Sequence, residues 1–411
     1  MAGTNKARRV LIYSHDSFGL GHLRRCRTLA HALVEQNPNL SVLILSGSPI
    51  IGSFDFKARV DFVRIPGIIK LRNGEYTSLS LHIDTEQTLA MRSSIIRHTA
   101  ETFDPDIFIV DKEPFGLRGE VEETLHMLKE KGTRLVLGLR DVLDDPALLV
   151  PEWTRKNVMP ALKSLYDDIW IFGVEQLYNP LQEINLPADV KRKVTYTGYL
   201  PRNEQISNEP AILEEIENPY VLITVGGGGD GEVLIDWVLR AYEADERPPM
   251  DALFVLGPFM PPETRTSFRE RIAQLDNVRA VTFNNHMESL MQHATAVVAM
   301  GGYNTFCEVL SLDKRALIIP RTVPRLEQYI RATRAAELGL ISVLIDDGVR
   351  SAEMMSTALK QLYQQKKPSE IVIPGLLDGL TNVNRLARLR FQERDAILEG
   401  TSNTLQWRPK S

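Results

Sequence analysis

The sequence predicts an α/β protein made of two doubly wound halves that face each other across a cleft. Short runs of valine, isoleucine and leucine alternate with amphipathic segments of helical length, and this alternation starts again in the second half of the chain. Such uninterrupted apolar runs are typical of parallel strands that are covered on both faces. Ligands of these folds bind beyond the carboxyl ends of the strands, so functional motifs are expected on the loops that follow strands.

The alternation gives the expected elements. The first half is expected to have strands at Arg9–Ser14, Ser41–Leu45, Ile107–Asp111, Leu135–Leu139 and Asp168–Phe172. Its expected helices are Leu23–Gln36, Thr85–Phe103, Leu117–Lys131 and Trp153–Tyr166. The second half is expected to have strands at Tyr220–Val225, Ala252–Leu256, Val278–Phe283, Ala296–Met300, Ala316–Ile319 and Ser342–Ile345. Its expected helices are Val233–Glu243, Glu263–Gln274, Met287–His293, Thr305–Leu310, Arg325–Leu338 and Ser351–Gln365.

A stretch near residues 198–215 has the proline, asparagine and serine content of a linker. We therefore expect one Rossmann-like domain over residues 1–200 and a second over residues 201–380. A final helix at Asn382–Leu398 lies in the remaining segment, residues 381–411, and is expected to pack back on the first domain.

The composition excludes several classes of protein. Of the 411 residues, 43% are hydrophobic and 25% are charged, which is typical of a globular chain, and the net charge of −5 argues against a nucleic-acid partner. Two cysteines, Cys26 and Cys307, are too few for a disulfide framework or a cysteine-based zinc site. Without a signal peptide or a long apolar run, a cytoplasmic location is expected. The segment Ile50–Arg72 mixes apolar and basic residues, which leaves both an ordinary strand and loop and a peripheral membrane contact open.

The loop after the first expected strand carries the first motif. Gly19 and Gly21 permit a sharp turn, and the helix that begins near His22 directs free N–H groups into the cleft. His22 is then placed to act as a base near neutral pH, although a structural histidine in a tight turn gives the same pattern. Arg25 adds positive charge beside the cleft.

The segment GLGHLRRCRTLA resembles the G-x-G-H-x-x-R motif of the nucleotide-sugar hydrolase of pseudaminic acid synthesis. It is also similar to the glycine-histidine loop of the MurG-type N-acetylglucosaminyltransferases. Both groups have the GT-B architecture, in which two Rossmann-like domains face a cleft. The resemblance implies that His22 is the catalytic base. Asp111, at the end of an expected strand, is a second candidate, although it also fits an N-cap or a salt bridge, as does the Arg140-Asp141 pair.

Two glycine-rich loops follow strands of the second half. The loop of Gly227, Gly228 and Gly229 is a candidate phosphate cradle, and the missing Gly-Lys-Ser/Thr disfavours a P-loop nucleotide hydrolase. The second motif reads G-G-x-N-T-x-x-E-x-L, with an E-Q-x-x-R-A motif beyond it. Gly301 and Gly302 leave space for a diphosphate and a sugar. Asn304 and Thr305 are expected to cap the next helix, Glu308 to accept both ribose hydroxyls, and Gln328 to bind the sugar.

Together these residues resemble the nucleotide-sugar site of the family 28 GT-B glycosyltransferases. The resemblance implies that Phe283 and Met287 line the uracil pocket. The acidic Asp230 in the glycine loop departs from MurG, and so does the Gly138–Val142 segment, so the acceptor is not expected to be the muropeptide of MurG. The second glutamate of retaining GT-B enzymes is missing, because Ala316 stands eight residues after Glu308, and this favours inversion.

The sequence therefore predicts an inverting hexosyltransferase. It would move a sugar from a UDP-sugar, with UDP-N-acetylglucosamine as the first candidate, to a polysaccharide, lipid-linked or other hydroxyl acceptor of the cell envelope. No cofactor or metal is expected, because no metal-binding motif stands out. Two alternatives are a nucleotide-sugar hydrolase, in which water is the acceptor, and a nucleotide-sugar-binding protein that has lost catalysis.

Overall fold

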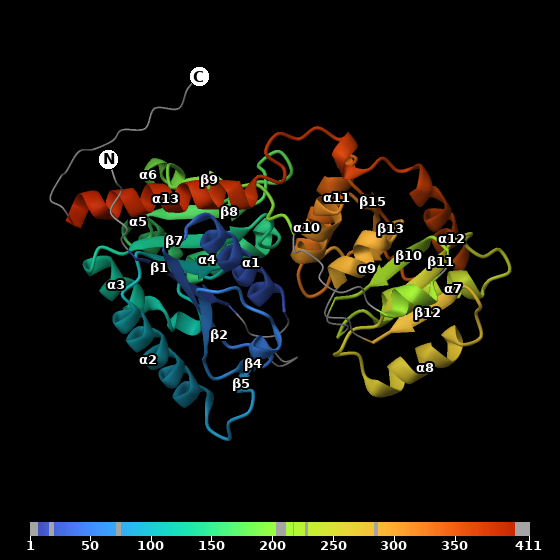
Figure 1. The fold of residues 1–411 in the computed structure, drawn as a ribbon, viewed down its shortest axis with the longest axis horizontal. Coiled ribbons are helices and arrows are strands. Elements are labelled where there is room, and N and C mark those ends of the chain that lie inside the picture. The colour runs from blue at the N-terminus through green and yellow to red at the C-terminus, as the bar shows by residue number, and fades with distance from the viewer. Residues whose placement is uncertain are drawn as a thin grey trace.

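The computed structural model describes residues 7–15, 20–70, 75–202, 211–216, 218–226, 229–282 and 287–398. These residues form two α/β bodies, each built around its own sheet, with helices on both sides (Figure 1). The predicted fold class, two parallel-sheet α/β halves, is confirmed. None of the helices in this part of the chain is long and apolar enough to span a membrane.

The first sheet has the strand order β3-β2-β1-β6-β7-β8-β9. These strands are β1 (Arg8–Ser14), β2 (Leu40–Ser46), β3 (Val60–Arg64), β6 (Ile107–Asp111), β7 (Arg134–Arg140), β8 (Asp168–Phe172) and β9 (Val194–Tyr196). All neighbours are parallel, and β1 lies between β2 and β6, with Ile12 opposite both Ile44 and Ile109. Strands β6 and β8 are buried along their whole length, which explains their uninterrupted apolar sequences.

The helices of the first body surround this sheet. They are α1 (Gly21–Gln36), α2 (Thr85–Phe103), α3 (Glu122–Glu130), α4 (Pro146–Arg155), α5 (Val158–Ser164) and α6 (Ala188–Lys191). Two expected helices are shorter or divided. The helix expected from residue 117 begins only at Glu122, because Arg118 has a positive φ of 51°. The helix expected from residue 153 is interrupted at Asn157, where φ is 49° and the chain leaves the right-handed helical region.

The candidate membrane segment forms several short elements. It contains a 3-10 helix (Ile51–Ser53), strand β3 and strand β4 (Ile68–Lys70). Strand β4 pairs in antiparallel fashion with β5 (Tyr76–Ser78), and residues 71–74 lie outside the described part of the chain. An ordinary strand-and-loop arrangement accounts for the described residues of this segment.

The second sheet has the order β12-β11-β10-β13-β14-β15. Its strands are β10 (Tyr220–Thr224), β11 (Asp251–Val255), β12 (Val278–Val281), β13 (Ala296–Ala299), β14 (Arg315–Ile318) and β15 (Ser342–Val343). The helices of this body are α7 (Glu232–Glu243), α8 (Pro262–Ile272), α9 (Met287–His293), α10 (Tyr303–Ser311), α11 (Glu327–Glu337) and α12 (Ala352–Gln361). The central strand β10 is parallel to β11 on one side and to β13 on the other, as in the first sheet around β1.

The last helix, α13 (Gly379–Leu398), returns to the first body and lies along it (Figure 1). The Asn384 amide donates to the Ala32 carbonyl of α1 at 3.2 Å. Near the other end of α13, Arg394 donates to Asp106 at 2.9 Å, and the Arg8 guanidinium lies 5.3 Å from the centre of the Phe391 ring. The chain therefore crosses between the bodies twice, and α13 ties the end of the described chain to the first sheet.

Candidate active site

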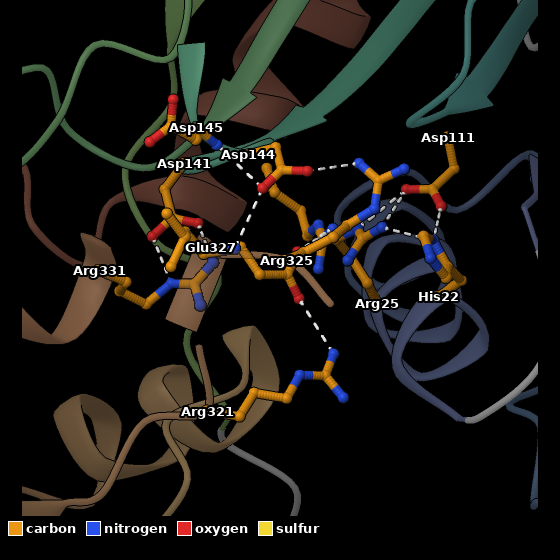
Figure 2. Close-up of polar contacts among 12 residues, drawn as sticks. His22, Arg25, Asp111, Asp141, Asp144, Asp145, Arg321, Arg325, Glu327 and Arg331 are labelled. Carbon is orange, nitrogen blue, oxygen red and sulfur yellow. Dashed lines mark hydrogen bonds and ion pairs between the residues drawn. The ribbon is translucent and has the colours of Figure 1, made fainter. Parts of the chain in front are cut away.

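His22, Arg25 and Asp111 form a hydrogen-bonded cluster where α1 begins and β6 ends (Figure 2). His22 Nδ1 lies 2.5 Å from Asp111 Oδ2, and Arg25 donates to Asp111 Oδ1 from Nε at 2.9 Å and from Nη2 at 2.5 Å. An ionised carboxylate only accepts, so Nδ1 carries the proton of a neutral His22 ring. The 3.0 Å approach of Arg25 Nη2 to Nδ1 is then a contact between two donors. Nε2 of His22 is left with its lone pair.

The environment of this cluster sets its protonation. Burial, together with the nearby Arg25 and Lys112 charges, lowers the pKa of His22 to about 4 against the opposing effect of Asp111. Burial opposes ionisation of Asp111, but Arg25 and His22 outweigh it and hold the pKa of this carboxyl well below its usual range. At neutral pH, Asp111 is therefore an anion and His22 a neutral ring able to accept a proton at Nε2. Asp111 itself is held by two partners, which favours an orienting role over that of a base.

Helix α1 begins in the manner expected for an anion-accepting end. Its N-cap is Leu20, which offers no side-chain cap, and there is no acidic residue in its first turn. Among the described residues, no capping side chain therefore satisfies the first N–H groups of the helix, and the anion nearest to its first turn is Asp111, which is bonded to His22 and Arg25. Gly21 lies at this end, and Gly19 lies outside the described residues.

Glu308 is buried on α10, with 3% of its side chain exposed, but an arginine of the first body reaches it. Arg24 Nη2 donates to Glu308 Oε1 and to Glu288 Oε1 of α9, both at 2.6 Å. Burial raises the pKa of Glu308, whereas Arg24 and the backbone lower that of Glu288 against the effect of burial. The predicted ribose-binding carboxylate is therefore part of an ion-pair cluster that joins the two bodies.

Asn304 also joins the two bodies, and the prediction that it caps α10 with Thr305 is wrong. The N-cap of α10 is Gly302, and no side chain caps the helix. The Asn304 amide instead donates to the Gly21 carbonyl at 3.0 Å, and its oxygen accepts from Arg202 at 2.5 Å. The side-chain amide of Asn304 therefore finds its hydrogen-bond partners outside its own helix, because the two bodies dock here.

Gln328 is buried at the start of α11, and its Oε1 accepts from the backbone N–H of Arg321 at 3.1 Å. The Arg321 side chain pairs with Asp230, in the glycine-rich loop between β10 and α7. This pair accounts for the acidic residue that departs from the MurG pattern, since its charge is balanced within the same body.

Of the remaining predicted binding residues, the structure describes some and leaves others out. Gly301 is buried with a φ of 75°, and Gly302 directly precedes α10. Met287 opens α9 and packs against the core, whereas Gly229 is exposed. Outside the described part of the chain lie Gly227, Gly228 and Phe283. Among the described residues, no three histidine, cysteine or acidic side chains gather as a metal site.

Three further ion pairs join the two bodies, and the sequence did not predict which residues would pair. Arg331 forms a bidentate pair with Asp141, with both distances 2.7 Å, and Tyr199 donates to the same carboxylate at 2.7 Å. Arg325 donates to Asp144 at 2.9 Å, and Arg140 lies 2.5 Å from Glu327. Figure 2 shows Asp141 and Asp144 of the first body opposite Arg325, Glu327 and Arg331 of the second. Sequence alone allowed a salt bridge for Arg140-Asp141, but it gave no sign of partners about 190 residues away.

Comparison with known proteins agrees with this arrangement. Residues 220–370 match the glycosyltransferase family 28 C-terminal domain. A protein of Methanosarcina acetivorans described as an uncharacterized glycosyltransferase is 24% identical over 313 residues, which cover 74% of this chain and 77% of the relative. MurG of Acinetobacter baumannii superposes with a TM-score of 0.53 at 13% identity, covering 95% of this chain and 99% of that one. A UDP-glucosyltransferase from Polygonum tinctorium gives 0.61 at 13% identity, covering 94% and 99%.

The fold is therefore GT-B, and the protein is a glycosyltransferase. The match to the family 28 C-terminal domain, residues 220–370, covers the strands of the second body and includes Gly301, Glu308 and Gln328. The resemblance that these motifs predicted is confirmed.

Proposed function

We propose that the protein is an inverting glycosyltransferase that moves a hexosyl group from a UDP-sugar to a hydroxyl acceptor. The observation that carries this proposal is the hydrogen-bonded pair of His22 and Asp111 at the interface of the two bodies. The first candidate donor is UDP-N-acetylglucosamine. A polysaccharide or lipid-linked acceptor of the cell envelope, and a cytoplasmic location, belong to the same proposal.

His22 supplies the base in this mechanism. Nε2 takes the proton of the acceptor hydroxyl while the acceptor oxygen bonds to the anomeric carbon from the face opposite the nucleotide. The bond from that carbon to the diphosphate oxygen breaks, and UDP leaves with the electron pair, so the configuration inverts. Asp111 fixes the ring orientation and stabilises the imidazolium that forms, in the way a triad carboxylate does. General-base assistance of this type contributes a factor of about 10²–10⁴ to the rate.

The second body would hold the donor, with Glu308 on the ribose, Gln328 on the sugar and the glycine turns near the diphosphate. The family 28 match over this body supports the assignment, and a structural neighbour is itself a UDP-glucosyltransferase. The helix ends and glycine N–H groups would stabilise the departing diphosphate without a metal. Ribose hydroxyls reach Glu308 only if Arg24 moves aside or shares the carboxylate, because Arg24 is bonded to it at 2.6 Å.

The donor assignment is tested by UDP affinity. Loss of a charged hydrogen bond costs about 1.5–3 kcal/mol, so Glu308→Ala should weaken UDP binding roughly tenfold or more in calorimetry. The matched control is Glu337→Ala, at an exposed pair on α11, which should leave affinity unchanged. Unchanged affinity in Glu308→Ala would remove this residue from the donor site.

The reaction is tested by UDP release from a panel of UDP-sugars, with and without carbohydrate and lipid-linked acceptors. We expect slow release by the protein alone, a large increase with an acceptor, and loss of that increase in His22→Ala with UDP affinity retained. Rapid sugar release without any acceptor would instead identify a hydrolase. Full transfer by His22→Ala would move the base to Asp111 or Asp141.

A further inference from the structure

Lys112 follows Asp111 in a backbone conformation that is unusual for a lysine. Its φ is 70°, in the left-handed region, where a side chain costs about 1–2 kcal/mol relative to glycine. Two hydrogen bonds hold this turn: the Lys112 N–H donates to the Gly138 carbonyl at 2.8 Å, and the Glu113 N–H donates to the Asp111 carbonyl at 2.9 Å. Strained positions of this kind cluster at ligand sites, where the surroundings enforce them.

The ammonium group of Lys112 has no hydrogen bond or ion pair with any side chain in the described part of the chain. The two carboxylates whose charges act on Lys112, Glu327 and Glu113, are each already paired with another cation. Glu327 pairs with Arg140 at 2.5 Å, and Glu113 pairs with Lys156 at 2.8 Å. Burial, together with the Arg140 and Arg325 charges, lowers the pKa of Lys112 to about 8. Lys112 is partly buried, and a cation that is partly removed from water and has no partner is costly, so an anion placed against it would relieve that cost.

Two further polar groups near Lys112 also lack partners among the described residues. His15, which is 7% exposed, has an unbonded Nδ1, and its ring lies 5.7 Å from the His22 ring in an edge-to-face arrangement. The Lys112 charge is close enough to lower the pKa of His15, to which burial contributes most. Arg140 Nε is likewise buried and unbonded. Three possible donors therefore come from the ends of β1, β6 and β7, beside the proposed base.

We propose that Lys112, with His15 and Arg140, forms a subsite for an anionic group on the acceptor, a carboxylate or a phosphate near the reacting hydroxyl. This inference rests on the proposed function. The subsite belongs to the first body and adjoins the Asp111–His22 pair, where the acceptor hydroxyl reacts. The donor diphosphate belongs to the glycine turns of the second body. Binding by Lys112 would place the acceptor by its charge and aim its hydroxyl at His22.

The subsite is tested first by binding, without catalysis. The probes are inorganic phosphate and glucuronate, with glucose as the neutral analogue, added to the full-length protein while thermal unfolding is followed at constant ionic strength. Both anions should raise the unfolding temperature in a saturable way, and glucose should not. Lys112→Met should abolish the rise with glucuronate and reduce that with phosphate, which can also bind at the donor diphosphate site, whereas the control Lys360→Met, at an exposed pair on α12, should keep both. An equal rise in both variants, or no rise in the unsubstituted protein, would overturn the subsite whatever the enzyme transfers.

A second variant separates the side chain from the strain of the turn. Glycine adopts a φ of 70° freely, so Lys112→Gly should unfold at the same or a higher temperature than the unsubstituted protein and yet lose the anion effect. Lys112→Arg should retain anion binding, because the positive charge remains. An unchanged anion effect in Lys112→Gly would show that the lysine side chain is not part of the subsite.

The last measurement distinguishes the acceptor from the donor as the source of the anion. UDP affinity of Lys112→Met should equal that of the unsubstituted protein, and saturating UDP should leave the glucuronate effect in place. Among acceptors that support UDP release, Lys112→Met should raise the KM of acidic ones at least tenfold more than that of neutral ones. A tenfold loss of UDP affinity would instead assign Lys112 to the donor diphosphate and overturn the proposal.

Discussion

At the scale of single residues, the site depends on one contact that joins α1 to β6. His22 and Asp111 are 89 positions apart in the chain, and their side chains meet because β6 lies directly beside β1 in the sheet. Arg25, one helical turn after His22, lies on the same side of α1 and binds the second carboxylate oxygen. The three side chains thus fix which nitrogen of the imidazole is available.

The role of Asp111 is tested by Asp111→Asn. The amide keeps the shape but offers a donor as well as an acceptor, so it no longer selects the tautomer with the proton on Nδ1, and Arg25 loses its counter-charge. We expect kcat for transfer to fall by about 10²–10⁴, with UDP affinity within a factor of two. Steady-state kinetics and UDP titration measure the two effects. A variant that binds UDP weakly but transfers at full rate would contradict the orienting role.

The pH dependence follows from the lowered pKa of His22. Because the ring is neutral above about pH 4, kcat/KM should be limited on the acid side only as pH falls through about 4, not through the ordinary 6.5. The free energy of unfolding should also decrease as the pH falls. A neutral ring is favoured in the folded state, so its contribution to stability is present above pH 6.5 and is lost as the pH falls toward 4. An acid limb near 6.5 that disappears in His22→Ala would show that His22 is solvated as an ordinary histidine.

At the scale of elements, the bounds of α2 and α9 agree with the sequence prediction, and the main strands agree to within a few residues. These elements were predictable because burial on both sides imposes apolar runs, and because α2 is capped by Asp84, whose side chain accepts from the Gln87 N–H. The bounds of the short edge strands β3 and β9 were not predicted, since each carries only a weak alternating pattern, although a strand was one of the alternatives left open for residues 50–72. The contact of Asn304 with Gly21 was missed for another reason, because it depends on how the two bodies dock.

The turn from β13 into α10 gives a prediction for neighbouring glycines. At Gly301, φ is 75°, and an added Cβ would lie 2.6 Å from Ile318 Cγ2 of β14. Gly301→Ala should therefore lower the free energy of unfolding by about 1–3 kcal/mol in urea denaturation. At Gly302, φ is −57° and no atom lies within 4 Å of an added Cβ, so Gly302→Ala should stay within about 0.5 kcal/mol. Equal destabilisation by the two changes would rule out this account of the turn.

At the scale of the whole molecule, the two bodies are joined by apolar packing and by ion pairs. The Tyr199 ring meets Phe306 of α10 at 5.1 Å, and the guanidinium groups of Arg25 and Arg331 both lie against the Tyr303 ring, at 5.5 and 5.7 Å from its centre. A residue of the proposed catalytic cluster thus contacts the same ring as the principal arginine of the interface. This arrangement couples the position of α1 to that of α10, so the relative placement of the bodies bears directly on the geometry at His22.

Arg331→Ala tests that coupling. Arg331 and Asp141 are both about 1% exposed, and removal of one partner of a buried pair typically costs about 3–5 kcal/mol, because the other charge is left uncompensated. We expect faster hydrogen exchange in β7 and α10 and a marked fall in acceptor-stimulated transfer. UDP affinity should fall less than transfer, because the second body loses only the 3.1 Å hydrogen bond from Arg331 Nη1 to the Gly301 carbonyl, whereas the bidentate contact between the bodies is lost entirely. Hydrogen-exchange mass spectrometry, transfer kinetics and UDP titration measure these effects.

The matched control is Arg334→Ala, one turn further along α11, whose pair with Glu337 is more than half exposed and should contribute about 0–1 kcal/mol. A double substitution, Asp141→Asn with Arg331→Met, separates the loss of the pair from the cost of an isolated charge. It should recover much of the stability lost in Arg331→Ala, because no buried charge remains unpaired, while transfer stays low, because the bodies no longer share the bidentate contact. If transfer recovered together with stability, the ion pair would only stabilise the fold, and the placement of the bodies would have to depend on the aromatic contacts of Tyr199 and Tyr303 instead.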